Sequence, residues 1–533
     1  MNGPEIKSVT MKLCSAALLL FLMAGWPGPA TADAQISEAW SRASTVDVSG
    51  RPISARLQAM GSLEASVEEP QDRITPWGFS DNPAGLRTDQ DSSTIDQSSH
   101  YDRFMDGLYA ESHSVVQRRS GFVAALRNTR GWVLGLEGIY GGLNASRHDF
   151  FPSPDNGRFI RDFDVLYPAN FDAPSGDIPI GASVSAPRIG LTYGRKFFHG
   201  IDLAGRLRYR HETESRSVPN PYEINLTSTE LALALGALVR PHVGSARFTV
   251  SASGGWTGNH VRGLSDGPFN NDQYDWDRPQ VHYDAQVGVR YKSLRGIIDG
   301  RHLSHDGEET AEINWAPQYF LNPLPINVNN PVEGVFKAKW SALLSGIRRN
   351  EVASRWMLDV PGTPAHVGIR YRYYRELEWV HPNTTVLTSA RLLDVRRLGY
   401  DASGGVSLDL PGRKGLIATE AHFTREGRQD FTGVLPEISS SEASFHFGGE
   451  YRALSWLPLR GGFVMIRRDP DREDAYPALK GVRLTAGVGY FWDFLDTQID
   501  AAFAHEHVRY TPGDPSVEIE RTDQASIVFR YAF

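Results

Sequence analysis

Hydrophobic and polar residues alternate along most of the chain after about residue 115. The segment that follows Gly200 is a clear example, with Ile201, Leu203, Leu207 and Tyr209 between Asp202, Arg206, Arg208 and Arg210. A period of two places these sets on opposite faces of a β-strand. Each arginine facing lipid would cost about 2 to 4 kcal/mol near the middle of a bilayer. We therefore predict a membrane barrel whose lumen these three arginines line.

The last eleven residues alternate in the same way and end on an aromatic side chain. Ala525, Ile527, Phe529, Tyr531 and Phe533 form an apolar stripe. Outer-membrane barrels carry girdles of aromatic residues at both membrane interfaces, which suits such a closing strand. We predict that Phe533, Tyr531 and Phe529 direct membrane assembly, so that removal of Phe533 impairs it. The terminal strand of a soluble β-sandwich is the alternative.

Short turns and long polar loops join these strands alternately. Tight turns include Phe198–Gly200 and Pro411–Arg413, whereas Gly142–Ala182 and Glu214–Thr227 are long. This asymmetry is typical of outer-membrane barrels, whose long loops lie outside the cell. The predicted fold is all-β: a monomeric transmembrane antiparallel β-barrel of about 14–18 strands, residues 114–533, with an amino-terminal plug-like segment. We count about 16 strands, and Glu309–Asn350 leaves room for an extra pair.

The amino terminus has the pattern of a secretory signal peptide. After Lys12 comes a short apolar run, and small residues suited to cleavage follow at Ala32 and Ala34. We expect residues 1–34 to be removed after export to the bacterial outer membrane. The only cysteine, Cys14, would leave with them. The mature chain would then lack disulfides, thiolate metal sites and a cysteine nucleophile.

Composition agrees with a barrel and excludes several classes of function. The 533 residues include 51 Gly, 25 Phe and 20 Tyr, and the mean hydropathy is −0.35. No segment after residue 34 is apolar for the roughly 20 residues that a spanning helix needs. The net charge of −8 is spread along the chain, so no nucleic-acid partner is expected. Acidic loop residues such as Asp272 and Asp275 fit no defined calcium loop, and we expect neither metal nor cofactor.

Two short motifs lie in the predicted plug segment, residues 35–113. The first is Ser54–Gly61, with the pattern Ala-Arg-x-x-x-Met-Gly, and the second is Asp81–Leu86, which contains Asn-Pro-Ala-Gly-Leu. The pair resembles the long-chain fatty acid outer-membrane transporter family and related exported barrels. That resemblance implies a plug inside a barrel of about fourteen strands. It also makes Asn82, Pro83 and Gly85 candidate substrate-binding or lumen residues.

The same stretch departs from the family between its two motifs. Glu64, Glu68, Glu69, Pro70 and Pro76 stand where the family has small residues and an Asp pair. The Asn82–Gly85 string is also a common turn, because Pro fixes φ, Gly permits positive φ, and Asn bonds its own backbone.

The function that this pattern favours is uptake of hydrophobic or amphipathic small molecules. Arg206, Arg208, Arg210 and Asp500, which alternates with Ile499 and Ala501, are the further candidate lumen residues. The expected partners are the small-molecule substrate, outer-membrane lipid and lipopolysaccharide, and the barrel assembly machinery. Two alternatives remain: a non-transporting barrel that scaffolds a secretion or surface complex, and a general pore.

A last alternative is a lipid acyl hydrolase, although an enzyme is not what the sequence favours. His302 and Ser304 lie two apart, so they share one strand face, opposite Asp299 and Arg301. Since charged faces line the lumen, we expect His302 and Ser304 to face lipid. Their His-x-Ser-x-x-Gly string resembles that of outer-membrane acyl hydrolases, and a third group must orient the imidazole. The alternative is a pair of polar residues at the water interface.

Overall fold

The structure is a computed structural model. It describes residues 54–67, 82–86, 93–106, 113–128, 131–148, 179–197, 200–218, 222–266, 271–277, 279–315, 336–382, 393–430, 438–470, 478–492, 497–511 and 518–532. The predicted signal peptide, residues 1–34, lies outside this part of the chain. Within it, no helix is long and apolar enough to cross a membrane.

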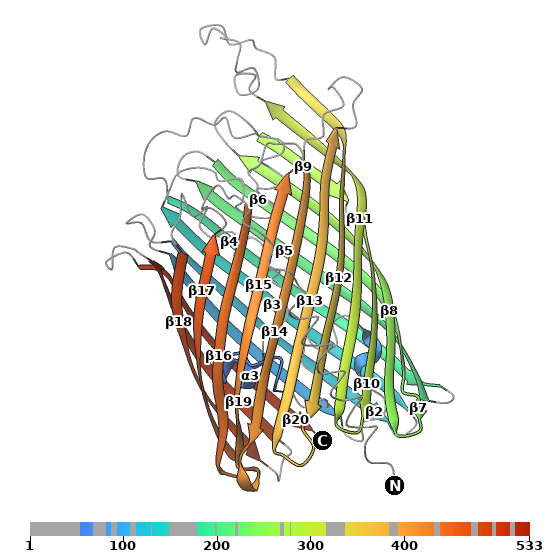
Figure 1. The fold of residues 1–533 in the computed structure, drawn as a ribbon. Coiled ribbons are helices and arrows are strands. Elements are labelled where there is room, and N and C mark those ends of the chain that lie inside the picture. The colour runs from blue at the N-terminus through green and yellow to red at the C-terminus, as the bar shows by residue number, and fades with distance from the viewer. Residues whose placement is uncertain are drawn as a thin grey trace.

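The described strands form one antiparallel sheet that closes on itself as a barrel (Figure 1). They are β1 (Thr94–Asp106), β2 (His113–Asn128), β3 (Trp132–His148), β4 (Pro179–Lys196), β5 (Ile201–Val218), β6 (Tyr222–Val239), β7 (His242–Val243), β8 (Ala246–Asp266), β9 (Asn271–Asp277), β10 (Gln280–Tyr291), β11 (Leu294–Trp315), β12 (Phe336–Asp359), β13 (Ala365–Pro382), β14 (Leu393–Asp409), β15 (Gly415–Asp430), β16 (Ile438–Leu454), β17 (Leu457–Pro470), β18 (Ala478–Trp492), β19 (Thr497–Thr511) and β20 (Glu518–Ala532). The short helices are α3 (Ala55–Ala59), η1 (Pro83–Leu86) and η4 (Pro411–Arg413).

The barrel has 18 strand positions, at the upper end of the predicted range. β7 is a two-residue stub that pairs only with the start of β8. β9 and β10 share one position, because both pair with β8 on one side and with β11 on the other.

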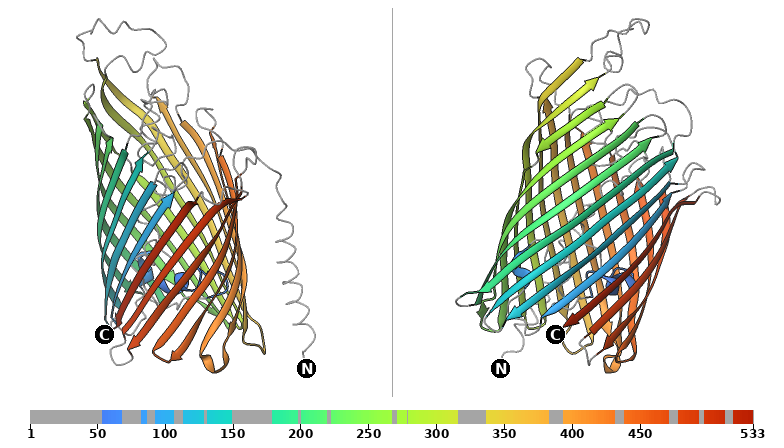
Figure 2. Two further views of the ribbon diagram at one scale, coloured as in Figure 1. Left: turned by 90° about the vertical axis from the view of Figure 1, so that its left-hand side faces the viewer. Right: turned by 180° about the vertical axis from the view of Figure 1, so that it is seen from behind.

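The first barrel strand begins ahead of the predicted boundary at residue 114. β1 pairs with β2 on one side and with the last strand, β20, on the other, which closes the ring (Figure 2). The alternation rule missed β1 because its outward positions include Gln97 and Ser99, which are polar. The barrel therefore starts at Thr94, and only residues before it are available for a plug.

The two faces of the strands sort as the alternation predicted. On β5, Leu203, Leu207 and Tyr209 are exposed on the outside, whereas Asp202 and Arg206 are buried inside. The same division runs around the ring, with exposed Leu, Val, Phe and Tyr outside and buried Glu, Asp, Arg and His inside. An apolar outer band over a polar interior is the surface of a membrane-spanning barrel.

The strands extend further on the long-loop side than the sequence predicted. β5 and β6 stay paired through Ser217 and Glu223, inside the predicted loop Glu214–Thr227. Within Glu309–Asn350, residues 309–315 continue β11 and residues 336–350 belong to β12. Residues 316–335, the place left for an extra pair, lie outside the described part of the chain. Above the membrane both faces of a strand meet water. The strands can therefore stay paired there even where hydrophobic and polar residues do not alternate.

Barrel closure can be tested with a disulfide between the first and last strands. Ser98 lies opposite Val528 in the β1–β20 register. In a Cys14→Ser background, Ser98→Cys with Val528→Cys should oxidise readily, because facing residues on paired strands lie within disulfide reach. Boiled, unreduced chain should then run faster in a denaturing gel than reduced chain. The control is Thr94→Cys with Val528→Cys, a pair that the register offsets by four residues. Equal disulfide yields from the two cysteine pairs would contradict closure at β1.

Candidate functional site

Residues 54–67 lie inside the barrel, against the inner faces of β12 to β20, near the end with the short turns (Figures 1 and 2). Ser54 caps α3, with its Oγ accepting a hydrogen bond from the Leu57 N–H at 3.2 Å. The helix ends at Ala59, and Gly61, just past the cap residue Met60, has a φ of +80° that glycine adopts without strain. The Gly61 and Ser62 N–H groups bond back to the Gln58 and Leu57 carbonyls, as in a Schellman motif. The chain thus reverses sharply after α3.

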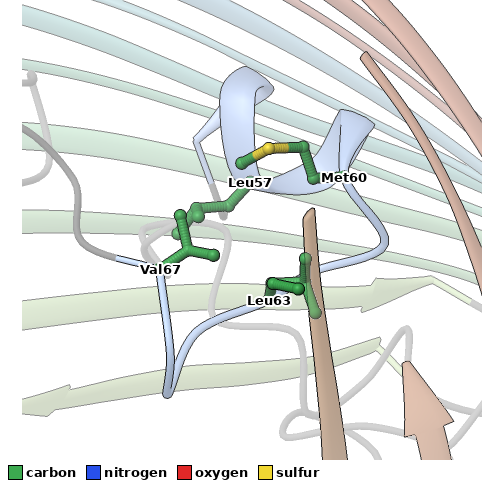
Figure 3. Close-up of a cluster of buried hydrophobic side chains, with 5 residues drawn as sticks. Leu57, Met60, Leu63 and Val67 are labelled. Atoms are coloured by element: carbon green, nitrogen blue, oxygen red, sulfur yellow. The ribbon is translucent and has the colours of Figure 1, made fainter. Parts of the chain in front are cut away.

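This turn encloses a small apolar cluster. Leu57, Met60, Leu63 and Val67 pack together and against Ala418 of β15 (Figure 3). The cluster fixes the shape of the segment, while its attachment to the wall is mainly polar.

Glu420 of β15 makes the largest set of contacts to residues 64–66, which follow the turn. Ser407 Oγ also donates to the Ser66 carbonyl at 2.9 Å, and Arg370 pairs with Glu64. Glu420 accepts hydrogen bonds from the N–H groups of Glu64 at 3.0 Å, Ala65 at 3.0 Å and Ser66 at 2.6 Å. The Ser66 hydroxyl donates a fourth bond at 2.7 Å, and His422 Nε2 lies 2.8 Å from the same carboxylate. Hydrogen bonds to an ionised group are about twice as strong as neutral ones, so Glu420 is the main anchor.

A second anchor forms around Glu450 of β16. Arg56 Nε lies 3.0 Å from this carboxylate, and Arg460 Nε donates to it at 2.8 Å. Arg460 also bonds Asp500, one of the predicted lumen residues. Asp500 is buried inside the barrel, and Arg460 links it to Glu450.

His446 of β16 forms a third contact. Its Nδ1 lies 2.6 Å from the carbonyl oxygen of Gly61, and its Nε2 lies 2.8 Å from Ser444 Oγ. Because a carbonyl only accepts, Nδ1 carries the proton and Nε2 accepts from Ser444. The ring stacks on His422 with centroids 3.9 Å apart. This stack links the Gly61 contact to the Glu420 anchor.

Glycines in the wall let the segment approach closely. A Cβ on Gly448 would lie 2.2 Å from the Met60 carbonyl oxygen, and one on Gly368 would lie 2.0 Å from that of Ala65. Any larger residue at these two positions would push the segment off the wall.

The second motif attaches to the opposite part of the wall. Asn82 Nδ2 donates to the carbonyls of Ala237 at 3.2 Å and Ala252 at 3.3 Å, while its Oδ1 accepts from the Ala84 N–H at 2.9 Å. Asn82 therefore closes the expected turn and also binds β6 and β8. Pro83 and Gly85 lie within η1, with Pro83 buried. A Cβ on Gly236 would lie 2.1 Å from Asn82 Oδ1, so this contact too requires glycine in the wall.

The three predicted arginines lie on the inner face of β5. Arg208 pairs with Glu137 of β3, and Arg210 pairs with Glu212 and Glu230. Arg206 is buried beside them. Their role as lumen residues that bind substrate stays a prediction.

The remaining predicted residues lie on or near the outer face. His302 and Ser304 share that face of β11, where His302 stacks on the exposed ring of Tyr283. Phe529 and Tyr531 lie in β20, in the stripe that includes the exposed Ile527. Phe533 lies outside the described residues, and the assembly role of all three residues stays a prediction.

Comparisons with known proteins add only similarity of fold. No family model matches, and no curated protein matches. Solved structures that align include the alcaligin outer-membrane receptor FauA of Bordetella pertussis, with 10% identity, 84% of this chain and 76% of that one covered, and a TM-score of 0.38. The toluene transporter TbuX of Ralstonia pickettii aligns at 12% identity over 91% and 99%, with a TM-score of 0.35. The toluene transporter TodX of Pseudomonas putida aligns at 12% over 90% and 97%, with a TM-score of 0.30. Likenesses this distant do not bear on the function of this chain.

The Glu420 anchor can be tested by accessibility. Leu63 is fully buried, so Leu63→Cys in a Cys14→Ser background should react slowly with a maleimide. Adding Glu420→Ala leaves three backbone N–H groups without their acceptor, at a cost of about 3 kcal/mol, so labelling should accelerate roughly 100-fold. Asp409→Ala, an exposed carboxylate at the end of β14, is the matched control. Equal labelling rates in the Glu420 and Asp409 variants would show that Glu420 does not hold the segment.

Proposed function

We propose that this chain is a bacterial outer-membrane barrel that takes up hydrophobic or amphipathic small molecules through a lumen gated by its amino-terminal segment. The observation that carries the proposal is the attachment of residues 54–67 to the inner wall through Glu420, Glu450 and His446. A general pore has no need of a chain segment bound across its interior.

The size of the ring supports a conduit. Barrels of 16–18 strands are wide enough to leave a channel, whereas an eight-stranded barrel is filled by its own side chains. With 18 strand positions, this barrel has room both for a segment of its own chain and for a small solute.

The inner wall supports an amphipathic cargo over a wholly apolar one. Buried ionised groups line it, among them Glu137, Arg208, Arg460 and Asp500. A solute with a polar head and an apolar tail can exchange hydrogen bonds with such a wall, whereas a hydrocarbon cannot. The expected partners are this solute, the surrounding outer-membrane lipid and lipopolysaccharide, and the assembly machinery that inserts the barrel.

The contacts that hold residues 54–67 on the wall are suited to gating because other groups can replace them. They consist largely of hydrogen bonds and ion pairs that water or a solute can replace, each contributing about 0.5 to 3 kcal/mol net. A cargo that competes for Glu420 or Arg460 would loosen the segment.

Uptake into liposomes tests the function directly. Reconstituted wild-type barrel should admit a fatty acid much faster than a small sugar, because the segment blocks passive flow of polar solutes. Entry of both at similar rates would indicate a general pore. Entry of neither would indicate a scaffold for a secretion or surface complex.

Removal of the segment tests gating. Deleting residues 35–92 stops short of β1, so the ring should still close, and single-channel conductance in planar bilayers should rise severalfold. Extending the deletion to residue 100 removes half of β1 and should abolish heat-modifiable gel migration. An unchanged conductance in the shorter deletion would place the segment outside the permeation path.

A further inference from the structure

We propose that the outer face of β10, β11 and β12 carries a serine acyl-hydrolase site for fatty acyl esters of membrane lipids. Ser304 is the nucleophile, His302 the general base, and Asn350 the residue that orients the base. This activity is independent of transport through the lumen.

The geometry that points to it is the contact between His302 and Asn350. His302 Nδ1 lies 2.8 Å from the amide oxygen of Asn350, its partner in the β11–β12 register. An amide oxygen only accepts, so Nδ1 carries the proton. The Nε2 lone pair is then directed away from Asn350 and available as a base. A fixed tautomer with an accepting Nε2 is what a hydroxyl nucleophile requires.

Ser304 lies two residues from His302 on the same face of β11. Within the part of the chain that the structure describes, no hydrogen bond joins Ser304 to His302. The same spacing on β16 shows that two residues on one strand face can meet, since Ser444 Oγ lies 2.8 Å from His446 Nε2. That inner pair is bound to Gly61, whereas the outer pair is open to the surroundings. A rotation of the Ser304 and His302 side chains completes the arrangement.

The position matches the depth of lipid ester groups. The Tyr283 ring, 57% exposed, stacks beside His302, and Trp256, 44% exposed, lies on the neighbouring strand β8. Exposed aromatic residues on a barrel mark the interface where acyl chains join their head groups. β11 starts after the short turn at Lys292, and His302 is its ninth residue, so at about 3.3 Å per residue His302 lies on the order of 25 Å along the strand from that turn. This is comparable to the height of the apolar band of an outer-membrane barrel. An outer-leaflet lipid therefore meets this face with its ester bond near Ser304.

A cation lies opposite the nucleophile. Arg348 pairs with Ser304 in the register and is exposed on the same face. In this site the role of its guanidinium would be to stabilise the oxyanion of the tetrahedral intermediate.

The reaction balances with water as the only co-reactant. Ser304 Oγ attacks the ester carbonyl carbon while its proton passes to His302 Nε2. The tetrahedral intermediate expels the lipid alkoxide, which takes that proton and leaves as the lyso-lipid alcohol. Water then attacks the acyl-serine, gives a proton to His302 and releases the fatty acid, and His302 returns the proton to Ser304.

The test uses the purified full-length barrel in detergent micelles with either a diacyl glycerophospholipid or lipid A, and it measures fatty acid release. Wild type should release fatty acid from at least one of them, and the pair of substrates separates the two lipid sources. Ser304→Ala should lose activity at least about 100-fold. Asn350→Ala should lose about 10-fold or more, whereas Asn350→Asp, which keeps an acceptor for Nδ1–H, should restore activity.

Two controls separate catalysis from folding. Ser183→Ala removes an exposed serine on the outer face of β4 and should leave activity unchanged. All variants should keep heat-modifiable gel migration. A fluorophosphonate probe should label wild type at Ser304, as located by mass spectrometry, and should not label Ser304→Ala. No fatty acid release by wild type from either lipid, or equal release by wild type and Ser304→Ala, would overturn the proposal.

Discussion

The whole structure depends on the requirement that no backbone N–H or C=O group be left unpaired in lipid. An open sheet would expose two edges, and pairing of β1 with β20 removes both. Once the ring is closed, each strand has one face toward lipid and one toward the lumen. Within the depth of the lipid hydrocarbon, charged side chains can then lie only inside. The concentration of Glu, Asp, Arg and His on the inner wall is thus a consequence of closure.

Those inward charges determine how the amino-terminal segment is held. A buried carboxylate is stable only when it is paired or hydrogen-bonded, and Glu420 satisfies this by binding three consecutive N–H groups of the segment. The same hydrogen bonds stabilise the segment, because its turn leaves those N–H groups without backbone acceptors. Glu420 and the segment thus satisfy each other's polar groups, and Asn82 adds donated hydrogen bonds to carbonyls of β6 and β8.

The sequence predicted which face of a strand a residue lies on better than it predicted which residues contact one another. Alternation assigned Arg206, Arg208 and Arg210 to the inner face and His302 to the outer face, because a period of two is a local property. It missed β1, whose outward positions are partly polar. It also could not identify Glu420 as the anchor of Ala65, since the two residues are 355 apart and meet only through the fold. The Asn350 partner of His302 is hidden in the same way, because strand register is not visible in either segment alone.

Hydrogen exchange at Ala65 and Ser66 tests most directly whether Glu420 holds the segment in the lumen. The measurement is amide deuteration of a peptide covering residues 61–67 in the folded barrel, compared with the same peptide free in solution. Bonds to a buried carboxylate should slow exchange of these amides at least about 100-fold, as protection follows the free energy of local opening. Exchange at the free-peptide rate would contradict an anchored segment.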